Sequence, residues 1–118
     1  MRPVCAIGHI GPLVVSSIAK AVEFYADLGM RRVMATPDMA ILELRGGTHL
    51  ILRRGMVTAG HAPFDLMVDD LDGVREQLER SGECPGPVRR GGVHRSFDLS
   101  DPDGHRVSIT SSHAMGPV

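Results

Sequence analysis

The two halves of the chain repeat one pattern. The stretch PFDLMVDDLDGVREQLERSG at residues 63–82 lies over IGPLVVSSIAKAVEFYADLG at residues 10–29 at a constant offset of 53 residues. In both stretches the apolar residues recur with period two and then change to a helical spacing at the same position. The repeat therefore predicts, in each half, a strand, a helix and a glycine that ends the helix. The matched pairs are Leu66 with Leu13, Val68 with Val15, Leu71 with Ile18, Val74 with Ala21, Leu78 with Tyr25 and Gly82 with Gly29.

Two neighbouring carboxylates, Asp69 and Asp70, stand where the second half changes from strand to helix. They fall on Ser16 and Ser17 of the first half. All four are residue types that cap helix N-termini by accepting hydrogen bonds from free backbone N–H groups. We interpret the two aspartates as caps. The alternative, a catalytic dyad, is disfavoured because serine replaces a cap but not a general base.

A hairpin follows each predicted helix. Residues 39–54 predict two strands around a Gly-Gly turn, and residues 94–110 predict two strands around Asp-Pro-Asp-Gly. The offset between the hairpins is 57, which places four extra residues in the loop 84–93. A further strand is expected before each hairpin, at 31–36 and at 87–90. Each half is then a βαβββ module.

The modules span residues 5–54 and 62–112, and RRGMVTAGHA at residues 53–62 links them. Each module is too short to bury a core alone, so we expect residues 1–118 to form a single domain of the α+β class. A content of 42% hydrophobic and 23% charged residues is typical of one compact soluble domain.

Composition excludes several partners. A net charge of -1, three Phe, one Tyr and no Trp give no basic, aromatic surface, so we expect no nucleic-acid partner. His9 and glycines interrupt the apolar N-terminal run, which falls short of the roughly 20 residues of a membrane span, so we expect no leader and no membrane partner. Cys5 and Cys84 have neither metal-type nor redox-type spacing, which favours a reducing cytoplasm.

In their order, spacing and duplication, three stretches resemble the vicinal oxygen chelate (VOC) superfamily: EFYADLGM, FDLMVDDLDGVREQLERSG and RSFDLSDPDGHRVSI. That family includes glyoxalase I, extradiol dioxygenases, and fosfomycin-resistance and bleomycin-resistance proteins. The resemblance covers nearly the whole chain. It implies two tandem βαβββ modules whose mixed sheets curl around a cavity, with the helices outside, and it implies a homodimer. Function stays open because members of the family share a fold and differ in chemistry.

The resemblance also implies where a metal would bind. In metal-dependent members the ligands are His or Glu residues on the first and last strands of each module. These positions here are Ile10, Ile51, Pro63 and Ser108. Zn, Fe, Mn or Ni needs about three donors from His, Cys, Asp or Glu, so we expect no metal site and no cofactor.

A displaced histidine site is the alternative to this reading. His49 shares the predicted face of Ile51, and His61 lies two residues before Pro63. A bulge at Gly11-Pro12 would turn His9 inward. Ligand geometry tolerates only small displacements, which disfavours this alternative.

Strand parity predicts which side chains face the cavity. The opposite parity is apolar and is expected to pack on the helices: Leu13, Val15, Leu50, Leu52, Phe64, Leu66, Val68, Val107 and Ile109. Ile10, Pro12 and Val14 are assigned to the cavity face. The candidate ligand-binding residues on that face mix polar and apolar groups, as ligand pockets do: His49, Arg53, Asp65, Met67, Arg106, Ser108 and Thr110. Alternatively, these polar groups face water or pair with one another, for instance Asp65 with an arginine.

Two classes of function follow. Arg53 and Arg106 would grip a carboxylate or phosphate, which favours a module that binds a small, anionic organic molecule without a metal. Such a module is similar to the bleomycin-resistance branch, although that branch binds its cationic drug in acidic grooves, so bleomycin itself is not expected. The alternative is an enzyme: a glyoxalase-like or dioxygenase-like metalloenzyme with displaced His ligands, or a metal-free lyase or isomerase with His49 and Asp65 as acid and base. A third hypothesis is a subunit whose dimerisation is its role.

Overall fold

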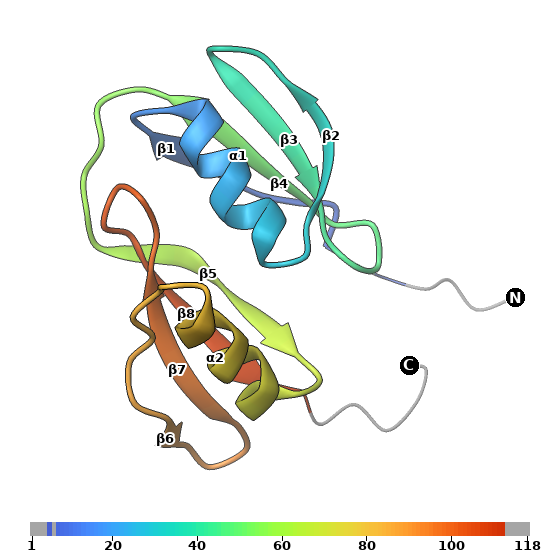
Figure 1. Ribbon diagram of the computed structural model, residues 1–118. Helices are drawn as coiled ribbons and strands as arrows, with labels where there is room; N and C mark the ends of the chain where they lie inside the picture. Colours follow the sequence, from blue (N-terminus) through green and yellow to red (C-terminus); the bar gives the residue numbers. More distant parts are fainter. Residues whose placement is uncertain (1–4, 6, 113–118) are drawn as a thin grey trace, which may run out of the picture. The chain divides into compact units, whose positions relative to one another are not determined.

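The computed structural model describes residue 5 and residues 7–112 of the chain. Between Ala59 and Gly60 the chain divides into two compact units. Each unit contains one helix and one four-stranded mixed sheet (Figure 1). The α+β class and the two tandem modules predicted from the repeat are therefore confirmed.

The first unit consists of a strand, a helix and a three-stranded meander. Its strand order is β1-β4-β3-β2, in which β1 runs parallel to β4 and the other pairs are antiparallel. The helix α1 packs against one face of this sheet (Figure 1). The elements are β1 (His9–Val15), α1 (Ile18–Asp27), β2 (Arg31–Ala35), β3 (Met39–Glu43) and β4 (His49–Arg54).

The second unit has the same topology. Its strand order is β5-β8-β7-β6, in which β5 runs parallel to β8 and the other pairs are antiparallel. The predicted strand at 87–90 is present but short, since β6 has only two residues. The elements are β5 (His61–Val68), α2 (Leu71–Arg80), β6 (Arg89–Arg90), β7 (Arg95–Ser100) and β8 (Arg106–Ser111). Neither α1 nor α2, the helices of the described residues, has the length and apolar character to cross a membrane.

The core of each unit lies between its helix and its sheet. The apolar residues expected to pack on the helices do form the core: seven of the nine are buried, and Phe64 and Val68 are half-buried. The buried members are Leu13, Val15, Leu50, Leu52, Leu66, Val107 and Ile109. Alternation along the strands leaves a second face on each sheet, remote from the helix, which we call the distal face.

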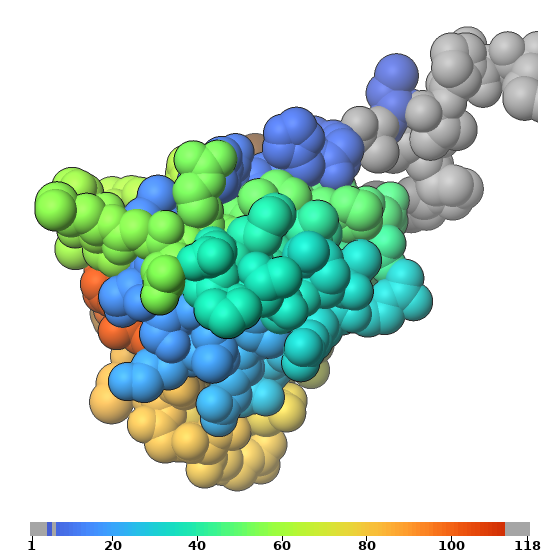
Figure 2. Space-filling view, turned by 90° about the horizontal axis from the view of Figure 1, so that it is seen from above, coloured from blue at the N-terminus to red at the C-terminus, as the bar shows by residue number. Residues whose placement is uncertain are grey.

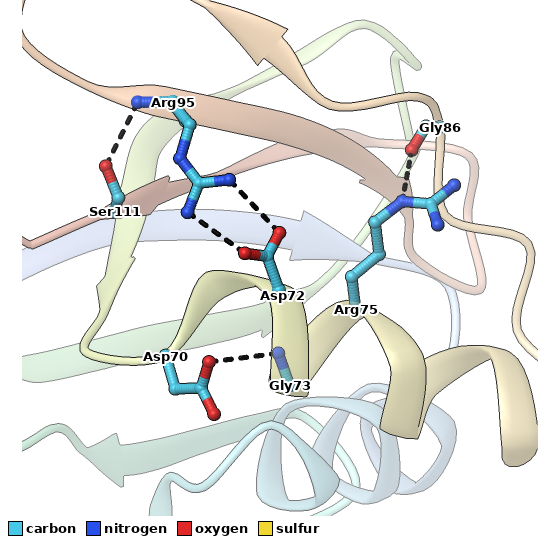
Figure 3. Close-up of polar contacts among 7 residues, drawn as sticks. All are labelled: Asp70, Asp72, Gly73, Arg75, Gly86, Arg95 and Ser111. Carbon is cyan, nitrogen blue, oxygen red and sulfur yellow. Dashed lines mark hydrogen bonds and ion pairs between the residues drawn. The ribbon is translucent and has the colours of Figure 1, made fainter.

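Of the residues interpreted as caps, Ser17 and Asp70 are the N-caps of the two helices. Ser17 caps α1, and its side chain accepts a hydrogen bond from the backbone N–H of Lys20. Asp70 caps α2 in the same way, accepting from the N–H of Gly73 at 3.1 Å (Figure 3). A Cβ at residue 73 would lie 2.2 Å from the Asp70 carboxylate, so glycine leaves room for this contact. In each of the pairs Ser16-Ser17 and Asp69-Asp70, the second residue therefore has a structural role as a helix cap.

An ion pair joins α2 to its sheet. The guanidinium of Arg95 on β7 donates two hydrogen bonds to the carboxylate of Asp72, at 3.1 and 3.2 Å (Figure 3). Arg75 on the same helix donates to the carbonyls of Gly86 and Pro85 and so holds the loop before β6. The hydrogen bonds and charge of Arg95 lower the pKa of Asp72 below its ordinary value of 3.8.

Strand β1 contains a register shift between Ile10 and Leu13. At the shift, Gly11 has a φ of +97°, and a Cβ there would lie 2.7 Å from the carbonyl oxygen of Ile51. The extra residue reverses the alternation before it, so His9 pairs with His49 while Ile10 pairs with the buried Leu50. The assignment of Ile10 to the cavity face is therefore wrong, and the bulge that would turn His9 to that face is confirmed.

We expect Gly11→Ala to lower the free energy of unfolding by about 1–3 kcal/mol, because alanine is strained at this φ and its Cβ would clash with the β4 backbone. Chemical denaturation measures the change. Gly8→Ala is the matched control, since a Cβ at residue 8 meets no atom within 4 Å; it should change stability by less than about 0.5 kcal/mol. Equal effects of the two substitutions would contradict the constraint at residue 11.

The Asp72–Arg95 ion pair makes the free energy of unfolding depend on pH in the acid range. Because the folded-state pKa of Asp72 is lowered, its contribution is fully present above the unfolded value of 3.8 and is lost as pH falls through the folded value. We expect Asp72→Asn to be less stable than the unmodified protein near neutral pH, with the difference shrinking in acid. Unfolding curves at several pH values measure this. Arg95→Ala should likewise be less stable than the unmodified protein near neutral pH, by a margin that shrinks in acid. A stability difference that does not change with pH would contradict the assignment.

Candidate functional site

The distal face of the first unit consists of three rows of side chains that cross the strands. The register of the strand pairs sets each row. The polar row is His9, His49, Glu43 and Arg31; the apolar row is Ile51, Ile41 and Met34; the Arg53 row is Val14, Arg53 and Met39. Polar groups therefore gather at one end of this face and a single cation lies at the other.

The polar row is an internally satisfied network. Arg31 forms an ion pair with Glu43, and the Nε2 of His49 lies 3.4 Å from the other carboxylate oxygen of Glu43. Desolvation acts to raise the pKa of Glu43, but the hydrogen bonds and charges of Arg31 and His49 outweigh it, so that pKa is lowered. The carboxylate is thus kept ionised and is committed to its two neighbours.

Arg53 is placed differently. Its side chain is exposed, and none of the described residues forms a hydrogen bond or ion pair with its guanidinium. Its neighbours across the sheet are the half-buried Val14 on β1 and the exposed Met39 on β3. A guanidinium with all its donors free thus lies on an apolar surface, an arrangement suited to a carboxylate or phosphate attached to an apolar body.

The distal face of the second unit is more polar. Arg106 donates a hydrogen bond to the Nε2 of His61 at 2.6 Å. The carboxylate of Asp98 accepts from the hydroxyl of Ser108 at 2.8 Å and from Arg89 at 3.0 Å.

Asp65 lies beside Ser108 in register, and no residue of the described chain bonds its carboxylate. The anticipated pairing of Asp65 with an arginine is therefore absent from the described residues: Arg106 on the adjacent strand β8 binds His61, and Arg89 on β6, at the far edge of the sheet, binds Asp98.

The seven candidate residues fall into two groups, and the role of each in ligand binding stays a prediction. Register places them all on distal faces: His49 and Arg53 in the first unit, and Asp65, Met67, Arg106, Ser108 and Thr110 in the second. Sequence reasoning missed the carboxylates of Glu43 and Asp98. The alternation in MAILE and RSFDLS would have assigned both to these faces.

The donor groups do not fit a transition metal at the four positions implied by the family resemblance. The side chains of Ile10, Ile51 and Pro63 carry no donor atom, and the hydroxyl of Ser108 is bonded to Asp98. Within the part of the chain that the structure describes, no group of three or more His, Cys, Asp or Glu side chains is placed to hold a metal ion. His9, His49 and Glu43 follow one another in register, but the carboxylate of Glu43 is engaged by Arg31 and His49, and among the described residues these three are not placed to hold a metal ion.

Comparison with known proteins shows the family. Residues 6–109 match the model of the glyoxalase/bleomycin resistance protein/dioxygenase superfamily, and the chain belongs to that superfamily. No curated protein matches the chain.

Similar solved structures show how widely this fold is shared. The lactoylglutathione lyase of Agrobacterium tumefaciens has a TM-score of 0.77 at 22% identity, over 98% of this chain and 100% of that one. The bleomycin-binding protein of Streptomyces verticillus, solved with copper(II)-bleomycin, has a TM-score of 0.68 at 23% identity, over 96% and 99%. A possible glyoxalase of Bacillus cereus has a TM-score of 0.72 at 18% identity, over 90% and 98%. At these identities the likeness concerns the fold, so function must be argued from the side chains.

Proposed function

We propose that this protein binds a small organic anion on the distal face of its first unit, without a metal, and that Arg53 is the principal anchor. The observation that carries the proposal is the free guanidinium of Arg53 between Val14 and Met39. None of the described residues pairs with this guanidinium, so a structural role does not explain a cation on this apolar surface. A ligand with a carboxylate or phosphate group and an apolar body satisfies both features.

Electrostatics on this face support an anion over a cation. The carboxylate of Glu43 is the acidic group of the three rows, and its charge is already compensated by Arg31 and His49. The Arg53 row has no acidic member. The planar guanidinium offers two parallel N–H donors, so it binds a carboxylate or phosphate in a defined orientation.

The distal face of the second unit carries candidate ligand-binding groups of its own. No described residue bonds the carboxylate of Asp65, which accepts hydrogen bonds and so suits a hydroxyl or amino group of a ligand. Arg106 keeps further N–H donors beyond the one that binds His61, which makes it a secondary anion-binding group. Met67, two residues along β5 from Asp65, is exposed and adds adaptable apolar contact.

One contact favours a second candidate function, metal-free acid-base catalysis. The carboxylate of Glu43 bonds one nitrogen of the His49 ring, and this leaves the Nδ1 available to move a proton. An enzyme of this kind would convert the bound anion, and His49→Gln would abolish conversion while binding persists. Binding with no conversion in the unmodified protein would leave the binding module as the function.

We expect Arg53→Ala to weaken the binding of an organic anion by about tenfold or more, since a hydrogen bond to a charged group contributes roughly 1.5–3 kcal/mol. A thermal-shift screen of small organic carboxylates and phosphates selects the compound, and titration calorimetry measures its affinity. Arg80→Ala is the control, because it removes the same charge from an exposed position on α2. Equal affinity in the Arg53→Ala and unmodified proteins would overturn the proposal.

A further inference from the structure

A cavity of about 640 Å³ lies in the first unit, on the side of the sheet that faces α1. Its walls are the N-terminal half of α1, the end of β2 with the turn that follows it, and Arg54. Figure 2 shows the surface of α1 in blue beside the β2–β3 segment in teal. The volume is in the range of small-molecule sites. The cavity is separate from the distal face, because its strand residues pair with buried core positions: Arg32 with Leu42, and Arg54 with Val15.

Three charged side chains line this cavity: Arg32, Arg54 and Glu23. None of the described residues bonds the side chain of Arg32 or that of Glu23, so the two line one cavity without forming an ion pair. Arg54 donates one N–H to the carboxylate of Asp38 at 2.8 Å, and its backbone N–H bonds the Asp38 carbonyl at 2.8 Å. These contacts hold Arg54 in place and leave the other N–H groups of its guanidinium available.

The rest of the wall consists of apolar side chains and the hydroxyl side chains of Ser16, Ser17 and Thr36. Ile18 is buried and Val22 is half-buried on α1, and Pro37 closes the turn after β2. The cavity therefore combines two guanidinium groups with an apolar wall and one carboxylate. Two arginines match a doubly charged phosphate better than a single carboxylate, because its three terminal oxygens can accept hydrogen bonds from both guanidinium groups at once.

We propose that this cavity binds a small phosphomonoester whose organic part carries an amino or hydroxyl group. Arg32 and Arg54 bind the phosphate, and Glu23 accepts a hydrogen bond from the amino or hydroxyl group. The site does not depend on the distal-face function. The adjacent residues Arg53 and Arg54 point to opposite faces of β4, so their substitutions separate the two sites.

A titration with O-phosphoethanolamine, followed by backbone amide NMR, tests the proposal. Saturable shifts are expected at the start of α1 and in the turn after β2. Arg32→Ala should weaken binding by about tenfold or more, and Arg53→Ala should leave it unchanged. Arg32 has no partner among the described residues, so its loss should not disturb folding, whereas Arg54→Ala also removes the contact to Asp38.

Glu23→Gln separates the roles within the cavity. It should weaken binding of O-phosphoethanolamine and strengthen binding of inorganic phosphate, because it removes a negative charge that attracts the amine and repels the anion. Three results would overturn the site: no saturable shift in the cavity, equal affinity in the Arg32→Ala protein, or loss of binding in the Arg53→Ala protein. The last result would move the phosphate to the distal face.

Discussion

Parallel pairing of the first and last strands is the constraint on which each unit depends. A parallel pair needs a crossover between its strands, and in both units the crossover includes a helix that must pack on one face of the sheet. That face therefore becomes apolar, while the opposite face is free to carry other chemistry. The period of two along each strand converts this division into a pattern in the sequence.

The glycine at residue 11 adjusts this pattern at one place. The shift in β1 turns His9 toward the distal face and Ile10 toward the core. It works only because a residue without a Cβ can pass the carbonyl of Ile51. A single backbone position thus decides which of two neighbouring side chains belongs to the candidate site.

Most of the fold was predictable from local patterns. The repeat located both helices, and Ser17 and Asp70 cap them as serine and aspartate do elsewhere. The shift at residue 11 was raised only as the alternative to a regular strand, because an extra residue leaves the alternation on either side of it looking regular. The partners of the candidate residues could not be predicted either: whether an arginine binds Asp65 or Asp98 depends on the register between paired strands, which the pattern of one strand does not give. The alternation of one strand predicts on which face a side chain lies, whereas its contacts depend on the register with a neighbouring strand.

The two sides of the first sheet are proposed to bind different ligands. Arg53 is proposed to bind an organic anion on the distal face, and the homodimer expected from the resemblance stays a prediction. Native mass spectrometry of the purified protein, with the Arg53→Ala protein as reference, tests the binding function most directly. We expect a retained organic mass without bound metal in the unmodified protein and its loss in the variant. A stoichiometric transition metal, retained equally by both proteins and with no organic mass, would contradict it.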